Sequence, residues 1–196
     1  MANAWQRNIP NRRDWLGVAY FLFATGLAIQ LFIQHPSLLS GLNVIHNGLL
    51  AFFYTKRFPA KSYDRIGLWL GMIAAFLPFF SFSMDLYWFS LLPALFGYFL
   101  ILYSLFTLGP RFGIAPADRG LTCRGPYLWI RHPMYAGELL FRLALIFSSR
   151  VSILSVLQIS LLFLIQILRI TREEALIDGY GCYRKVVRWR LVPGVW

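Results

Sequence analysis

Charged side chains are scarce in this chain: they make up 14% of its 196 residues, and only eight residues are acidic. Soluble domains carry about 25% charged residues, so the composition argues for a protein embedded in a membrane. Cysteine is also rare, and Cys123 and Cys182 are its only representatives. No companion ligands accompany them, so we interpret both as free thiols rather than as metal ligands.

Several motifs that would define a soluble enzyme are absent. No glycine-rich GxGxxG pattern follows a predicted strand, which excludes a soluble Rossmann domain. No HExxH motif, CxxC motif or histidine cluster occurs, so no metal site is predicted. No serine, histidine and aspartate stand in an order that suggests acyl transfer. Internal repeats and low-complexity tracts are missing as well.

Hydrophobic residues, by contrast, make up 58% of the chain and are concentrated in six apolar stretches. The stretches are Leu16–Ile33, Leu38–Tyr54, Ile66–Phe82, Leu86–Leu108, Met134–Phe147 and Val151–Leu168. Five have the length of roughly 17 to 25 residues that crosses hydrocarbon as a helix. The fifth is shorter and contains Glu138 and Arg142, which we interpret as a structural pair four residues apart. The sequence therefore predicts an all-α integral membrane protein, a bundle of about six (five to six) transmembrane helices.

The distribution of basic residues predicts the orientation of these helices. The net charge is +11, and in a six-helix arrangement 17 of the 19 lysines and arginines fall on one side of the membrane. Positive residues are enriched in cytoplasmic loops, so we expect both termini in the cytoplasm. Five crossings would instead place the basic C-terminal tail outside. This distribution argues against nucleic-acid binding, and the first apolar stretch is interpreted as a retained anchor.

A polar loop and a polar helix start stand between the fourth and fifth apolar stretches. The loop runs from Gly109 to Arg131 and contains Gly-Pro and Ala-Pro pairs, so we expect it to be ordered. Pro133 suits the first turn of a helix, where amides have no partner within the helix and attract anions. His132 and Tyr135 can hydrogen-bond a polar ligand there. Alternatively, His132 lies among lipid headgroups and Tyr135 belongs to an aromatic belt.

Charged residues follow the sixth apolar stretch and continue its helical pattern. Arg169 and Glu173 lie four residues apart and share one helix face. A glycine, Gly179 or Gly181, is expected to end this helix. Glu173 and the adjacent Glu174 allow two interpretations: they bind a ligand, or they form a solvated pair that balances the neighbouring arginines. The basic and aromatic tail that follows is suited to the lipid headgroup region.

Three sequence blocks occur in order in the second half of the chain. They are Gly120-Leu121-Thr122 with Gly125-Pro126-Tyr127, then Arg131-His132-Pro133-Met134-Tyr135-Ala136-Gly137, and finally Arg169-x-x-Arg172-Glu173-Glu174. Together they resemble the isoprenylcysteine carboxyl methyltransferase family of integral membrane enzymes, over about residues 111 to 196. One departure is Tyr180-Gly181-Cys182-Tyr183, which is shorter than the family's corresponding segment. Val186 follows it where the family commonly has a second tyrosine.

The resemblance implies a methyltransferase that uses S-adenosylmethionine as its cofactor. It places ten residues around the cofactor: Arg119, Gly120, Leu121, Thr122, Tyr127, His132, Pro133, Met134, Tyr135 and Glu173. It assigns Arg169 to the substrate as the expected catalytic arginine. The short connections between the apolar stretches predict a single membrane domain, residues 1–196. We expect it to consist of a four-span part (1–108) and a methyltransferase-like catalytic part (109–196), with a cytoplasmic cofactor loop and a short C-terminal tail.

The expected acceptor is a lipophilic molecule that enters from the lipid membrane. The first hypothesis for the reaction is carboxyl O-methylation of an isoprenylcysteine-like compound. A carboxylate is ionised near pH 7, so it needs no general base, and an arginine can bind it. One alternative is N-methylation of a phospholipid or other lipid amine, whose ammonium form a guanidinium would repel. The other is a non-enzymatic transporter or scaffold whose arginines bind anionic lipid.

Overall fold

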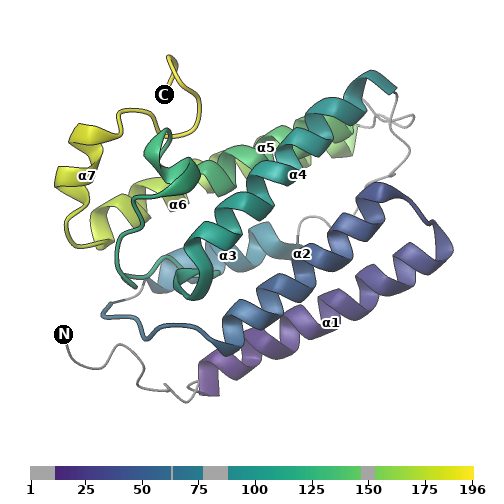
Figure 1. Cartoon of the computed structure of the whole chain (residues 1–196), viewed down its shortest axis with the longest axis horizontal. Coiled ribbons are helices and arrows are strands. Elements are labelled where there is room, and N and C mark those ends of the chain that lie inside the picture. The colour runs from purple at the N-terminus through teal and green to yellow at the C-terminus, as the bar shows by residue number, and fades with distance from the viewer. Residues whose placement is uncertain (1–11, 63, 77–87, 147–152) are drawn as a thin grey trace. The chain divides into compact units, whose positions relative to one another are not determined.

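A computed structural model describes residues 12–62, 64–76, 88–146 and 153–196 (Figure 1). Its α-helices and 3-10 turns are, in chain order, α1 (Arg12–Gln34), α2 (Leu38–Thr55), α3 (Arg65–Phe76), α4 (Trp88–Leu108), η2 (Gly109–Arg111), η3 (Gly125–Leu128), α5 (Pro133–Ile146), α6 (Ile153–Leu176) and α7 (Tyr180–Val186). Strand-type pairing within these residues is limited to an isolated bridge between Ile130 and Trp189. The prediction of an all-α chain is confirmed for the part that the structure describes.

The helices follow the predicted apolar stretches, with ends that differ by a few residues. α5 begins at Pro133, as the proline predicted. α6 continues past the apolar stretch to Leu176, and Gly179 follows with a φ of 78°. That left-handed conformation favours glycine and ends the helical path, as expected. Pro93 lies inside α4.

Three described helices are long and apolar enough to cross a membrane: Trp15–Gln34, Trp88–Arg111 and Ile153–Leu176. α3 is described over 12 residues, which is shorter than a span requires. The rest of its predicted stretch, residues 77–82, and the connection between the fifth and sixth predicted stretches, residues 148–150, lie outside the described residues. The structure supports a helical membrane protein, while six crossings stay a prediction.

Large apolar side chains are exposed along α4 and α6. Trp88 and Leu92 on α4 are 85% and 75% exposed, and Ile153, Leu157 and Leu164 on α6 are between 58% and 82% exposed. Soluble monomers rarely present contiguous apolar surface of this kind. Lipid tails are as apolar as leucine, so a bilayer covers such faces readily. This exposure supports a position within the membrane.

Contacts within the chain form two compact units. The first comprises Met1–Pro59 with Gly109–Gly113, and the second comprises Ala60–Leu108 with Ile114–Trp196. The predicted site residues, from Arg119 onwards, all belong to the second unit. The prediction of a single membrane domain over residues 1–196 stays a prediction.

Aromatic packing and a helix cap organise the first unit. The ring of Tyr54 on α2 lies 5.2 Å from that of Phe21 on α1 and 5.9 Å from that of Phe112. Ser37 caps α2. Its hydroxyl accepts a hydrogen bond from the amide of Ser40, and the hydroxyl of Ser40 accepts one from the amide of Ser37. This reciprocal capping satisfies amides that a helix start leaves unpaired.

In the second unit, two glycines allow the backbones of α4 and α5 to touch. A Cβ atom at Gly97 would lie 2.8 Å from the carbonyl oxygen of Gly137, and one at Gly137 would lie 2.7 Å from that of Gly97. A Cβ atom at either distance would clash with a backbone atom that cannot move aside, so both positions require glycine. Small residues let membrane helices pack closely where no hydrophobic effect drives them together. The contact fixes the first turns of α5, which carry Tyr135 and directly follow His132, against α4.

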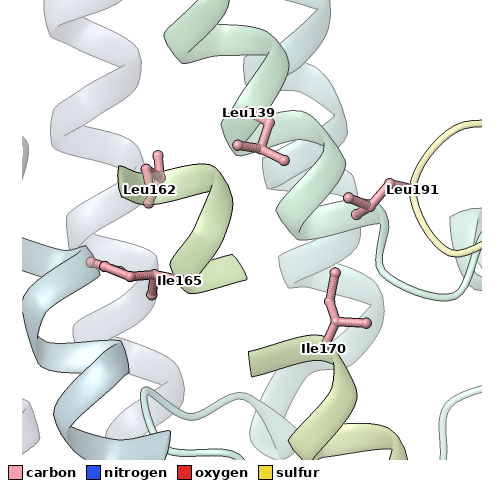
Figure 2. Packing of buried hydrophobic residues seen from close by; sticks show 6 residues of the cluster. Leu139, Leu162, Ile165, Ile170 and Leu191 are labelled. Atoms are coloured by element: carbon pink, nitrogen blue, oxygen red, sulfur yellow. The ribbon is translucent and has the colours of Figure 1, made fainter. Parts of the chain in front are cut away.

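α6 buries one continuous stripe of residues at spacings of three and four. The stripe contains Ser155, Gln158, Ile159, Leu162, Ile165, Gln166, Arg169 and Ile170. This spacing follows one face of an α-helix. Leu162, Ile165 and Ile170 belong to a hydrophobic cluster with Leu139 of α5 and Leu191 of the tail (Figure 2). The same packing turns Arg169 inward, and Glu173 follows one turn later.

Candidate active site

The polar loop before α5 is held by backbone hydrogen bonds to the segment that precedes α3. The amide of Lys61 donates to the carbonyl of Asp118 at 2.9 Å, and the amide of Asp118 donates to that of Ser62 at 3.0 Å. The buried Asp118 carboxylate accepts the amide of Gly120 at 3.0 Å. Gly120 has a φ of 87°, which glycine adopts without strain. The loop around Leu121 is therefore ordered, as the sequence predicted.

An ion pair attaches α6 to the same segment. Arg172 donates two hydrogen bonds to the carboxylate of Asp64, one from Nε and one from Nη2. The bond from Nη2 is 2.8 Å long. The hydrogen bond from Arg172 holds the pKa of Asp64 below its ordinary value. Arg172 therefore pairs with Asp64. This corrects the interpretation in which Glu173 and Glu174 balance that arginine.

The residues before α5 are joined to the C-terminal tail. The amide of Arg131 donates to the carbonyl of Trp189 at 2.8 Å, and the amide of His132 donates to that of Arg190 at 2.9 Å. Leu191, which follows, is buried in the core. The tail was expected among lipid headgroups, but this part of it packs inside the protein. The reason is that it offers backbone acceptors and an apolar side chain to the start of α5.

Glu174 is the centre of a charge network. Its carboxylate accepts hydrogen bonds from Nε and Nη2 of Arg190 at 3.0 and 2.9 Å, and lies 3.1 Å from Nη1 of Arg131. Its Oε1 also lies 3.3 Å from Nε2 of His132. The side chains of Glu174 and Arg131 are only 10% and 8% exposed, so water screens this attraction little. The bond to Glu174 raises the pKa of Arg190, whose guanidinium therefore stays charged.

His132 lies between two tyrosines and near a second glutamate. Its ring is nearly parallel to that of Tyr135, with 5.6 Å between centroids, and its Nε2 lies 3.0 Å from the hydroxyl of Tyr180. The hydroxyl of Tyr135 donates to Oε2 of Glu173 at 3.0 Å, and Nδ1 of His132 lies 4.0 Å from that oxygen. Burial raises the pKa of Tyr180, so its hydroxyl keeps its proton. The structure thus brings His132, Tyr135 and Glu173 together.

Arg169 is buried beside this cluster and is held by neutral groups. Its guanidinium carbon lies 4.8 Å from the centre of the Tyr135 ring, within cation–π range. Nη1 donates to the side chain of Gln166 at 3.3 Å, and Nη2 donates to the carbonyl of Ile114 at 2.9 Å. Gln166 in turn donates to Glu138 at 2.6 Å. Nε of Arg169 is buried with no hydrogen-bond partner among the described residues. The guanidinium is fixed in place by groups that do not neutralise its charge.

The loop residues predicted around the cofactor are also anchored. Leu121 packs against Tyr180, Tyr183 and Val187 of α7 and its C-terminal end. The hydroxyl of Tyr183 donates to the carbonyl of Tyr127 at 2.5 Å. The two tyrosines of α7, whose roles the sequence left open, therefore support the loop and His132. This support links the tail region to the predicted cofactor loop.

Three further predicted residues complete the set. The hydroxyl oxygen of Thr122 is buried with no hydrogen-bond partner in the described part of the chain. Such an orphaned polar atom costs free energy, which a bound polar ligand would recover. Arg119 and Met134 are half-buried, on the loop and on the first turn of α5.

Sequence reasoning missed Arg131, Glu174 and Arg190 as members of the cluster. Glu174 stood beside the predicted Glu173, and its position on the inward side of α6 was the available signal. Arg190 carried no signal, because it lies in a short tail without helical periodicity. Their meeting requires the tail to fold back onto α5.

The cluster suits a ligand that carries both an ammonium and a carboxylate group. Glu173 is 28% exposed and can accept a hydrogen bond from an ammonium. The first-turn amides of α5 are suited to a carboxylate. Arg169 adds a site for a second anion, one turn before Glu173 on α6. Methionine-derived compounds carry both an ammonium and a carboxylate group.

A comparison with known families finds a match in this part of the chain. The model of the isoprenylcysteine carboxyl methyltransferase (ICMT) family matches residues 89–178. The matched range contains α4, the polar loop, α5 and α6 with Arg169, Glu173 and Glu174, whereas α7 and Arg190 lie beyond it. No curated protein and no solved structure matches the chain.

Methyltransferase activity is what this family match indicates, and the long apolar helices support a membrane protein. The resemblance seen in the sequence blocks is confirmed: residues 89–178 match the model of the isoprenylcysteine carboxyl methyltransferase family.

Proposed function

We propose that this protein transfers the methyl group of S-adenosylmethionine to a lipophilic acceptor in the membrane, by carboxyl O-methylation of an isoprenylcysteine-like compound. The observation that carries the proposal is the grouping of His132, Tyr135 and Glu173 next to the buried Arg169. The family match supports methyl transfer, and the surrounding chemistry supports the choice of cofactor and acceptor.

The residues present fit S-adenosylmethionine. Glu173 would hold its ammonium group, the amides at the start of α5 would hold its carboxylate, and the orphaned hydroxyl of Thr122 offers a further polar contact. The cofactor supplies a methyl group on a positively charged sulfur, which a nucleophile displaces in line. The contribution of the protein is alignment, since a fixed geometry removes much of the entropy barrier.

Arg169 favours a carboxylate acceptor over an amine. A carboxylate is already ionised near pH 7 and is attracted by the guanidinium. A lipid amine would first have to lose its proton, and the positive charge of Arg169 would repel its ammonium form. Arg169 is buried on α6 directly after its apolar stretch, which supports a place for the polar head of a lipophilic molecule. N-methylation of a lipid amine remains the second candidate.

The cofactor proposal predicts that Glu173→Gln weakens S-adenosylmethionine binding by about tenfold. The substitution removes the charge but keeps an oxygen for the hydroxyl of Tyr135, so the loss reports the ammonium contact, typically worth about 1.5–3 kcal/mol. Isothermal calorimetry on the purified full chain in detergent measures it. Asp178→Asn is the matched control, because Asp178 is an exposed acid on the same side whose loss removes the same charge.

Two results would count against the proposal. Equal affinities for Glu173→Gln and Asp178→Asn would remove Glu173 from the cofactor site. Absence of saturable binding to the unmodified protein would favour the transporter or scaffold alternative, which needs neither an ordered loop nor an acceptor for an ammonium.

We further propose six crossings with both termini in the cytoplasm, which lets a soluble cofactor reach the loop from that side. The basis is the 17-to-2 division of basic residues together with the exposed apolar faces of α4 and α6. Reporter fusions after Tyr54, Asp85, Asp118 and Trp196 are expected to lie inside, outside, inside and inside. An external reporter after Trp196 would contradict six crossings and indicate that α5 enters and leaves on one side.

A further inference from the structure

Glu174 and its two arginine partners join three separate parts of the chain. Arg131 comes from the loop before α5, Glu174 itself from α6, and Arg190 from the tail. Arg190 supplies two of the hydrogen bonds, through Nε and Nη2, to the two different carboxylate oxygens. A two-point contact of this kind fixes the plane of the carboxylate as well as its position. Arg190 thereby determines how Oε1 faces His132.

The orientation of Glu174 has a consequence for the protons of His132. The two arginines keep Glu174 ionised, and an ionised carboxylate can accept hydrogen bonds but cannot donate one. Nε2 of His132 lies 3.3 Å from Oε1, so this nitrogen must carry a proton for the contact to be favourable. The hydroxyl oxygen of Tyr180, 3.0 Å from the same nitrogen, can accept from it too. In the neutral imidazole, Nδ1 is then left without a proton. That nitrogen lies on the side of Glu173 and can accept a hydrogen bond there.

We propose that Arg190 is a positioning residue: through the carboxylate of Glu174 it keeps the imidazole of His132 with its proton on Nε2 and with Nδ1 open beside Glu173. This inference rests on the proposed function, in which Glu173 and Nδ1 together accept an ammonium group. It assigns a role to a residue beyond the segment that matches the family. Without Arg190, the carboxylate loses both bonds that fix its plane, and His132 is free to exchange its two neutral forms.

The surroundings of Arg190 allow a clean substitution. The tail is attached independently of that side chain, since the carbonyls of Trp189 and Arg190 accept the amides of Arg131 and His132, and Leu191 is buried. Arg190→Gln therefore removes the clamp and leaves the backbone contacts. Arg188→Gln is the matched control: it removes the same charge two residues earlier, from an exposed side chain that contacts the ring of Trp189.

The test is nitrogen NMR of the full chain in detergent with 15N-labelled histidine, recorded without cofactor. The sequence has three histidines, and His132→Gln identifies the signal. We expect a single neutral form with the proton on Nε2 in the unmodified protein and in Arg188→Gln, and a mixture of both neutral forms in Arg190→Gln. Calorimetry should show about tenfold weaker S-adenosylmethionine binding for Arg190→Gln, and unchanged binding for the control Arg188→Gln. Arg190→Lys keeps the positive charge but loses the two-point contact of the guanidinium. Its histidine spectrum and its cofactor affinity should lie between those of the unmodified protein and of Arg190→Gln.

Identical histidine spectra for Arg190→Gln and Arg188→Gln would overturn the proposal. So would a mixture of forms in the unmodified protein. If Arg190→Gln does not fold, Arg190→Lys supplies the same comparison, and an unchanged spectrum there overturns the proposal equally. The NMR readout is independent of the cofactor, so a protein that shows the expected spectra but binds no S-adenosylmethionine would contradict the proposed function alone.

Discussion

Replacing Arg169 with lysine is expected to lower methyl transfer to a carboxylate acceptor by about 10- to 100-fold while S-adenosylmethionine binding is retained. A guanidinium binds a carboxylate through two parallel hydrogen bonds, whereas an ammonium offers a point charge, and a charge-assisted bond is worth about 1.5–3 kcal/mol. The neutral partners of Arg169, Gln166 and the carbonyl of Ile114, hold the fork without cancelling its charge. Radiolabelled methyl transfer and cofactor calorimetry on the same preparation measure both quantities.

The competing view treats Arg169 as a residue that only orders the helix. In that case, turnover and cofactor affinity should fall together in Arg169→Lys. Arg184→Lys is the matched control, because Arg184 is exposed on α7 and the exchange is chemically the same. Turnover of a carboxylate acceptor that survives Arg169→Ala would show that the proposed role is wrong and would favour an amine acceptor.

Glu174→Gln is expected to lower the free energy of unfolding by about 3 kcal/mol, because removing one partner of a buried ion pair leaves the other charge uncompensated. Here two guanidinium groups, those of Arg131 and Arg190, would face a neutral amide, and Arg131 is only 8% exposed. Chemical unfolding in detergent, followed by tryptophan fluorescence, measures the change. The amide group is nearly the same size, so packing changes contribute little.

The neighbouring Glu173→Gln provides the control for this stability prediction. Glu173 is 28% exposed and accepts one hydrogen bond, from Tyr135, which an amide oxygen can still accept. We expect a loss below about 1 kcal/mol. Equal losses for the two substitutions would show that the network around Glu174 contributes no more to stability than an exposed carboxylate does.

Hydrophobic pattern and proline placement were sufficient to predict α1 to α6, whereas α7 was not predicted. The apolar stretches locate α1 to α6 because a helix that faces lipid must be apolar on its outward face, and that requirement is written in consecutive residues. Pro133 located the start of α5, since proline is favoured in the first turn, where an amide would have no partner within the helix. The four-residue spacing of Arg169 and Glu173 likewise placed both on one face of α6.

The pairing of charged residues could not be predicted in the same way. Arg172 was expected near the glutamates that follow it, but it pairs with Asp64, which lies 108 residues earlier. Arg190 appeared to belong to a basic tail at the membrane surface, but it binds Glu174 on α6. Eight acidic residues in the chain are candidate partners for either arginine. The folded backbone determines which of them is near.

The sequence by itself determined that the chain is helical, that its helices are apolar enough for a membrane, and that polar residues gather around the start of α5. These features follow from local requirements: the helix period, the thickness of hydrocarbon and the conformational limits of proline and glycine. Only the tertiary structure decided that Glu174, rather than Glu173, is the acid that binds Arg131 and Arg190. A rotation of about 100° along the helix separates these two neighbours, so packing against the loop and the tail turns one carboxylate inward and leaves the other available to a ligand.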